Sequence, residues 1–272
     1  MKRSVDLNKP AAPDATLFVG AGVTLYAGTL DDLDWHLHGA PVFVAGMTGN
    51  FRLRLPDGEW AACRAAIVPA GVRHALELGG DPVAVFYPEP TIADVSHLTR
   101  LGGGWDDRHS ILFTSGAELG IFRDIYEDRG SPGYVDEAIK DLVRFLRKRQ
   151  SEPSLDPRIA RVIERLRRQP EDLTAVASLS ADSGLSVSRF LHLFSSEIGI
   201  PFRRYRIWNR VRAALAMMLA GQNLTAAALN AGFSDSSHFA RLHRQTFGVA
   251  ASCTFRRIAR KVTARPQRQG PI

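Results

Sequence analysis

The sequence predicts an α+β chain: a small antiparallel β-barrel, then helices, then an all-α domain in which two helix-turn-helix motifs are joined by a long helix. Two observations predict this arrangement. Short alternating segments separated by Gly, Pro and Asp run through roughly the first 90 residues, and helical periodicity replaces them afterwards. Within the helical half, segments 176–200 and 224–249 are diverged copies of one pattern. A chain of 272 residues is long enough for two domains that each bury a core.

The barrel is expected over residues 1–90. Phe51-Arg52-Leu53-Arg54-Leu55 alternates apolar with polar side chains, as a strand with one buried face does. Turn signals such as Pro56-Asp57-Gly58 recur at spacings typical of a sandwich or barrel. Strands are therefore expected at 41–45, 51–55, 65–68 and 83–87.

Residues 91–150 are predicted to form a helical segment for packing or dimerisation. Its apolar side chains follow the stripe of an amphipathic helix at Val135, Ile139, Leu142, Val143 and Leu146. The stripe fits packing on the barrel alone, or packing combined with a dimer interface. A linker is expected at 151–156, where Ser151-Glu152-Pro153-Ser154 interrupts the helical pattern.

From Pro157 onward the pattern predicts only helices, which form one domain over 157–260 followed by a basic tail at 261–272. One of them carries Phe202, Tyr205 and Trp208 at steps of three, so it is expected to be a rigid spacer between the two repeats. The expected helices span roughly 157–168, 174–182, 186–197, 201–219, 224–230, 235–246 and 250–259.

Charge is divided unevenly between the two halves. Residues 155–272 contain 19 Lys and Arg against 7 Asp and Glu, whereas residues 1–154 contain 16 against 21. A basic half is expected to bind a polyanion, nucleic acid foremost, and the alternative is a solvated Arg-rich surface.

The two cysteines, Cys63 and Cys253, lie far apart and favour a reducing cytoplasm over a disulfide framework. No apolar stretch reaches the roughly 20 residues that cross a bilayer, so neither membrane insertion nor secretion is expected.

The repeat is the most informative functional feature. Each copy has a small-residue-rich helix, a turn at Gly184 or Gly232, and a second helix with one apolar face and one face free for a DNA groove. On that free face Arg241 can donate two hydrogen bonds to guanine, and His192, its counterpart in the first copy, can donate to a base acceptor. An ordinary surface role is the alternative for each residue taken alone. The candidate DNA-binding residues are Ser186, Ser188, Leu191, His192, Arg210, Ser236, Ser237, Ala240, Arg241 and Arg244.

These motifs give the chain its resemblance to a known family. The stretch 157–258, with Gly184-Leu185-Ser186, Arg189-Phe190-Leu191-His192-Leu193-Phe194 and the region 231–241, resembles the DNA-binding domain of AraC/XylS-family transcriptional regulators. It departs from the family pattern at His243, where an aromatic residue is usual. The resemblance implies two recognition helices in successive major-groove segments of an asymmetric site on double-stranded DNA. It further implies a cupin-like sensor barrel, a homodimer and RNA polymerase as a partner.

The barrel contains a second group of chemistry-bearing residues. His36 and His38, separated by one residue, are expected on the same face of a strand, and His74 could complete a facial set for a divalent metal. The runs around them resemble the two cupin motifs, but no Glu follows His38 where metal cupins usually supply a ligand. Metal binding, an organic-effector pocket and purely structural histidines remain alternatives. The effector pocket is favoured, with no metal or cofactor assigned, and its candidate residues are His36, His38, Arg52, Arg73 and His74.

The predicted function is that of a cytoplasmic, sequence-specific DNA-binding transcriptional regulator controlled by a small-molecule effector. An enzymatic activity is not expected. The alternative from another class is a cupin-type metalloenzyme with a basic accessory domain. Metal content and sequence-selective DNA binding would separate the two.

Overall fold

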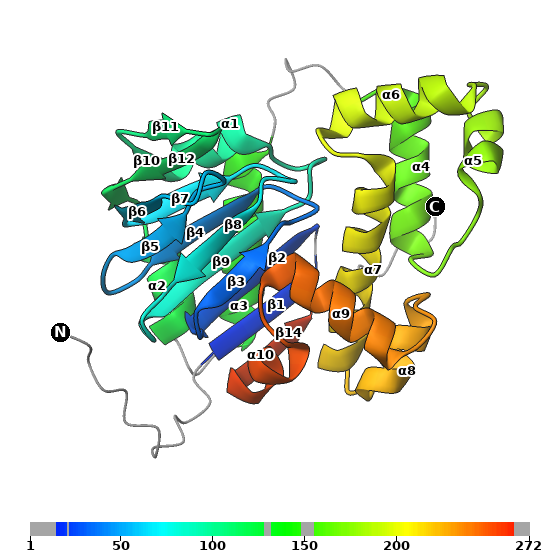
Figure 1. The fold of residues 1–272 in the computed structure, drawn as a ribbon. Coiled ribbons are helices and arrows are strands. Elements are labelled where there is room, and N and C mark those ends of the chain that lie inside the picture. Colours follow the sequence, from blue (N-terminus) through cyan, green and yellow to red (C-terminus); the bar gives the residue numbers. More distant parts are fainter. Residues whose placement is uncertain (1–14, 21, 128–131, 148–154, 264–272) are drawn as a thin grey trace.

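The chain folds into a β-rich lobe and a helical lobe that lie side by side (Figure 1). The computed structural model describes residues 15–20, 22–127, 132–147 and 155–263. The predicted linker at 151–156 falls mostly outside these ranges, as does the end of the predicted basic tail. Within the described residues, no helix is both long and apolar enough to cross a membrane.

The β-rich lobe is built on one large sheet. All neighbouring strands in it are antiparallel except the edge pair β1 and β14, which run parallel. In spatial order its strands are β11 (Asp106–Arg108), β12 (Ile111–Thr114), β7 (Ala65–Val68), β4 (Val42–Gly46), β9 (Pro82–Pro88), β2 (Val23–Thr29), β1 (Ala15–Gly20) and β14 (Ile258–Thr263).

A four-stranded sheet packs on one face of the large sheet. In spatial order its strands are β3 (Leu33–His36), β8 (His74–Glu77), β5 (Phe51–Arg54) and β6 (Trp60–Cys63). Along β5 the predicted alternation is confirmed, because Phe51 and Leu53 are buried in the core shared by the two sheets while Arg52 is exposed. The antiparallel strands expected from the sequence are therefore present. In the residues described they form two packed sheets, with no closed barrel among the sheet pairings.

Helices cover the other face of the large sheet (Figure 1). These are α2 (Gly120–Glu127) and α3 (Pro132–Leu146), and their apolar side chains share a core with Phe43 and Phe86 of the sheet. The whole predicted stripe of α3 is buried there, so packing on the sheet accounts for it. The expectation of a helical segment over 91–150 is wrong for residues 102–117, because β11 and β12 extend the large sheet and two short strands, β10 (Gly102–Gly103) and β13 (Gly116–Ala117), pair with each other.

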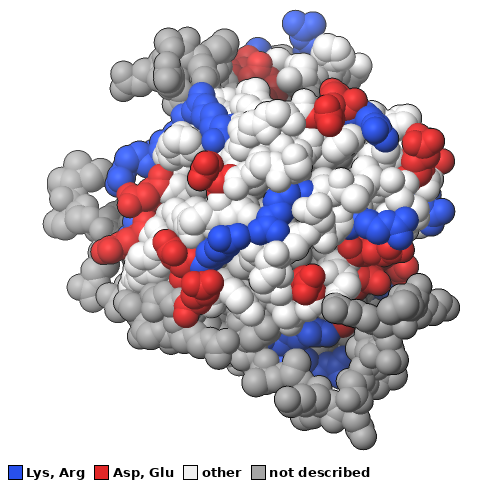
Figure 2. Space-filling model, turned by 90° about the vertical axis from the view of Figure 1, so that its left-hand side faces the viewer, with Lys and Arg blue, Asp and Glu red and all other residues white. Residues whose placement is uncertain are grey.

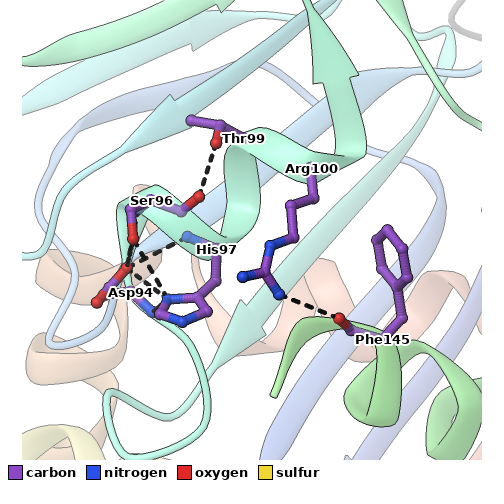
Figure 3. A network of polar contacts seen from close by, with 6 residues as sticks. All are labelled: Asp94, Ser96, His97, Thr99, Arg100 and Phe145. Carbon is purple, nitrogen blue, oxygen red and sulfur yellow. Dashed lines mark hydrogen bonds and ion pairs between the residues drawn. The ribbon is translucent and has the colours of Figure 1, made fainter. Parts of the chain in front are cut away.

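A short helical turn fastens the end of α3. It comprises α1 (Val95–Leu98) and a 3₁₀ turn at Thr99–Leu101. The carboxylate of Asp94 caps α1 by accepting from the backbone N–H groups of Ser96 at 2.9 Å and His97 at 3.2 Å (Figure 3). From the next turn, Arg100 donates to the carbonyl oxygen of Phe145 at 3.4 Å. This carbonyl belongs to the last turn of α3, where no partner exists within the helix.

The helical lobe contains every helix that the sequence predicts after residue 157. Their bounds are α4 (Pro157–Arg168), α5 (Val176–Asp182), α6 (Val187–Ile198), α7 (Phe202–Leu219), α8 (Leu224–Asn230), α9 (Ser236–Phe247) and α10 (Ala251–Arg257). The expectation of helices alone is wrong at β14, which returns to the β-rich lobe and pairs with the edge of β1. That edge would otherwise present unpaired backbone groups, so a distant partner rather than local pattern makes this segment a strand.

Candidate functional site

The first helix-turn-helix motif consists of α5 and α6. Ser186 caps α6, and its hydroxyl accepts from the backbone N–H three residues later at 3.3 Å. Phe190 and Phe194 are fully buried against α4 and α7. The opposite face is open to solvent, with Leu191 exposed to 37%. The predicted contact residues Ser186, Ser188, Leu191 and His192 all lie on this exposed face.

The second motif consists of α8 and α9. Gly232 makes the turn in the left-handed region at φ +84°, and a Cβ there would come within 3.0 Å of the backbone of Glu171. Asp235 caps α9 by accepting from the backbone N–H of His238 at 2.7 Å. Phe239 is fully buried. Of the predicted contact residues on α9, Ser236 is half-buried, and those that are exposed are Ser237, Ala240, Arg241 and Arg244.

Helix α7 connects the two motifs and is buried along much of its length. Tyr205 packs with the first motif, whereas Trp208 and Leu215 pack with the second motif and the sheets. Arg210, a predicted DNA-binding residue, is half-buried beside Gly232. Burial lowers the pKa of its guanidinium, and its Nε has no hydrogen-bond partner within the described structure. Arg210 therefore lies behind the turn of the second motif and not on its outer face.

The two motifs differ in what they are packed against. The first has its own apolar core with α4 and the beginning of α7. The second shares one continuous core with the two sheets of the β-rich lobe, from Leu53 to Phe239. The second motif is thus built into the β-rich lobe, while the first stands on a separate core.

The C-terminal end of α9 docks on β3. The backbone N–H of Asp34 donates to the carbonyl of Gly248 at 3.2 Å, and that of Leu37 donates to Gln245 at 3.3 Å. A carboxylate oxygen of Asp34 lies 3.2 Å from the guanidinium of Arg244. Gly248 is required here, because a Cβ would meet the carbonyl oxygen of Asp34 at 2.6 Å. The predicted DNA contact Arg244 is therefore engaged by the β-rich lobe.

The three predicted histidines meet beneath this docked end. His36, His38 and His74 are at most 2% exposed, and their ring centroids are 4.3 to 5.0 Å apart. Nδ1–H of His36 donates to the carbonyl of Asp34 at 2.6 Å, and that of His74 to Val72 at 3.0 Å. Burial lowers the pKa of His36 to about 4. It also lowers the pKa of His38 and His74 well below the usual value, so all three rings are neutral at pH 7.

A pocket of about 530 Å³ opens between the two lobes beside the histidines. Trp35 lines it from the β-rich lobe and Ile207 and Trp208 from α7. Its basic lining residues are Arg73, Arg203 and Arg204. In the described part of the chain, no carboxylate forms an ion pair with any of these three guanidinium groups.

The predicted effector residues are only partly brought together. Arg73 and His36 line the pocket, while His38 and His74 lie buried behind His36. Arg52 lies elsewhere, because it pairs with Glu77 at 2.7 Å on the outer face of the small sheet. The side of the β-rich lobe opposite the helical lobe mixes basic with acidic residues (Figure 2). No single basic area dominates the described part of that face.

Arg203 and Arg204 were not predicted as site residues. They occupy the first turn of α7, which contains no acidic residue. Cations are unfavourable at a helix N-terminus because of the helix dipole. Two adjacent arginines there are a sequence signal for an anionic partner, and this signal could have identified them.

Comparisons with known proteins agree with this geometry. Residues 179–257 match the family model of a helix-turn-helix domain. The probable transcriptional regulator LumQ of Photobacterium leiognathi is 21% identical over 228 residues, which cover 79% of this chain and 89% of that protein. ToxT of Vibrio cholerae with bound unsaturated fatty acid is similar in structure, with a TM-score of 0.56 and 12% identity over 89% of this chain and 97% of that chain. A second ToxT structure from Vibrio cholerae has a TM-score of 0.54 and 13% identity, over 88% of this chain and 98% of that chain.

Proposed function

The C-terminal part of this chain belongs to the AraC-type helix-turn-helix family, and on that premise we propose that the protein is a sequence-specific DNA-binding transcriptional regulator. The observation that carries the proposal is the pair of recognition helices, α6 and α9, with buried aromatic residues on one face and exposed polar residues on the other. The basic excess of residues 155–272 supplies the attraction to phosphates.

The two helices offer different chemistry to DNA. His192 and Leu191 on α6 correspond to Arg241 and Ala240 on α9, so each copy would select a different base sequence. The site is therefore asymmetric, with the two helices in successive major-groove segments. Ser186, Ser188, Ser236 and Ser237 would bond bases or phosphates near the helix N-termini. Arg210, which lies behind the turn of the second motif, would stabilise the conformation of that motif.

Binding of random-sequence DNA pools to the full chain, followed by sequencing, tests this proposal. The expected result is one enriched asymmetric sequence spanning two neighbouring major-groove segments. Binding that depends only on salt and selects no sequence would contradict it. A variant with Leu191→Ala and His192→Ala should relax one half of the enriched sequence, because these residues lie on α6 alone.

We propose further that the interdomain pocket binds the effector, an organic anion with an apolar body. Trp35, Ile207 and Trp208 would cover the body, and the guanidinium groups of Arg73 and Arg204 would bind its carboxylate. The unsaturated fatty acid bound by ToxT, a protein of similar fold, is a compound of this class and supports the choice. A ligand held between the lobes would bias their arrangement, which is what control of DNA binding requires.

Ligand binding can be tested with oleate and its uncharged methyl ester. The full chain should bind oleate, bind the ester at least tenfold more weakly, and lose affinity for oleate when Arg204 is replaced by Gln. Arg52→Gln is the matched control, since it removes an arginine outside the pocket. Equal affinity for acid and ester would contradict a carboxylate-binding role for these arginines.

Partners and location complete the proposal. A homodimer would place two such domains on one promoter, and Phe145, exposed to 55% on α3, is an apolar residue available to a second copy. A regulator that acts at promoters would contact RNA polymerase and would be located in the cytoplasm. A regulator of this kind needs no enzymatic activity.

A further inference from the structure

The three buried histidines have a property that the proposed function does not use. One ring nitrogen of each lies within 4.8 Å of a ring nitrogen of each of the others. Each histidine also keeps one buried ring nitrogen that has no hydrogen-bond partner among the described residues, namely Nε2 of His36, Nδ1 of His38 and Nε2 of His74. Three neutral imidazoles thus lie in one small space, and each keeps an unused lone pair.

The other ring nitrogens are all held by backbone carbonyls. Asp34 holds His36, Val72 holds His74, and the carbonyl of Thr246 at the end of α9 accepts from His38. Metal-binding histidines are usually oriented in this way, because the bond to the second nitrogen fixes the tautomer and the ring direction. A purely structural histidine has no need to leave its second nitrogen unpaired in a buried place.

We propose that His36, His38 and His74 bind one divalent first-row transition metal ion of the kind that prefers imidazole ligands, such as Zn²⁺. Within the described residues the set contains no carboxylate or thiolate, which disfavours Mg²⁺ and Ca²⁺. Metal–nitrogen bonds of about 2 Å need ligand atoms about 3 Å apart, so the three nitrogens, which lie within 4.8 Å of one another, would draw closer together when the ion binds.

The site is joined to the DNA-reading helix. His38 donates a hydrogen bond to the carbonyl of Thr246 in the last turn of α9. Gly248 packs so closely against His36 that a Cβ on Gly248 would lie 2.7 Å from Nδ1 of that histidine. The ring of Phe247 lies 6.1 Å from that of His38. An ion that fixes these rings would therefore fix the docked end of α9. Metal occupancy would in this way strengthen the contact between the second motif and the β-rich lobe.

Metal binding is measured on the tag-free full chain, without DNA or effector, so its outcome is independent of the proposed function. After chelation and dialysis the protein should take up one equivalent of Zn²⁺ that survives gel filtration. His36→Gln and His74→Gln should each lose it, whereas His243→Gln, a control at another buried histidine that packs beside Phe239 and Phe247, should retain it. No retained equivalent in the wild type, or full retention in His74→Gln, would overturn the site.

A spectroscopic measurement avoids dependence on variants that fail to fold. Co²⁺ added to the folded wild type should give visible ligand-field bands that Zn²⁺ abolishes at one equivalent, and a spectrum of aqueous Co²⁺ alone would overturn the proposal.

Hydrogen exchange tests the link between the metal site and α9. Amides 244–248 should exchange at least tenfold more slowly with Zn²⁺ than after chelation, while those of α6 should not change. Equal exchange at 244–248 would overturn the coupling.

Discussion

Arg212, in the middle of α7, forms a buried ion pair with Glu89, the residue that follows β9. The two residues are 8% and 2% exposed. The same guanidinium donates to the hydroxyl of Thr24 at 3.0 Å and to the carbonyl of Val23 at 3.3 Å. One side chain therefore fastens the helix that carries both motifs to the large sheet.

Replacing Arg212 by Ala should lower the free energy of unfolding by about 3 kcal/mol, because among the described residues it leaves the buried Glu89 carboxylate with only the longer ion pair to Arg167, at 3.4 Å. Arg52→Ala is the control, since the pair of Arg52 and Glu77 is exposed and should contribute at most about 1 kcal/mol. Urea unfolding measures both variants. Similar losses of unfolding free energy in the two variants would show that burial does not increase the contribution of the Arg212–Glu89 pair to stability.

Arg241→Ala should weaken binding to the selected DNA sequence by about 1–3 kcal/mol and relax the preference at one base pair. The reason is the loss of two hydrogen bonds from an exposed guanidinium on the outer face of α9. Fluorescence anisotropy with single-base variants of the site measures the change. Arg144→Ala removes the same charge from α3 and should leave the preference intact. An unchanged base preference in Arg241→Ala would rule out base contact.

Asp34→Ala should increase DNA affinity about fivefold at low salt. Without the carboxylate that lies 3.2 Å from it, Arg244 is free to bind a phosphate, and one added phosphate contact steepens the dependence of log K on log salt by about one unit. Glu77→Ala removes an equal charge that is paired with Arg52, away from α9, and serves as the control. If both variants gain affinity equally, net charge alone is responsible.

His243 should make stability depend on pH. Its ring is 1% exposed and donates to the carbonyl of Val249 at 3.0 Å, and burial lowers its pKa to about 4. In the unfolded chain the His243 imidazole has a pKa near 6.5, so as the pH falls it binds a proton before the same group in the folded chain does. Stability that is present above pH 6.5 is therefore lost between pH 6.5 and 4.

The measurement compares the wild type with His243→Phe, which places the aromatic residue usual in the resembled family. From pH 7 to pH 5 the wild type should lose about 2 kcal/mol more unfolding free energy than the variant. Chemical denaturation at the two pH values gives both differences. Parallel losses in the two proteins would mean that other groups, including the buried histidines of the β-rich lobe, account for the pH dependence.

Features set by local pattern could be predicted from the sequence. The helix expected at 186–197 is Val187–Ile198, and the one expected at 224–230 has those bounds, because Ser186 and Asn223 cap them and apolar residues recur at helical spacing. The exposed recognition positions followed from the same periodicity.

Features that depend on distant partners could not be predicted. Arg244 meets Asp34, 210 residues away, and no local pattern in either segment indicates the other. The same holds for β14 against β1 and for the pocket, whose walls come from both lobes. In the sequence, Arg52 and Arg73 looked equally suited to bind an anionic effector, and only the folded structure shows that Arg52 pairs with Glu77 whereas Arg73 lines the pocket.

The separate core under the first motif has a consequence for how such proteins can diversify. Substitutions in α6 are confined to a small hydrophobic unit with α4, so a new base preference can arise there without repacking the sheets. Substitutions beneath α9 disturb a core that extends into the β-rich lobe. Relatives that acquire new target sequences should therefore vary first in the half of the site read by α6.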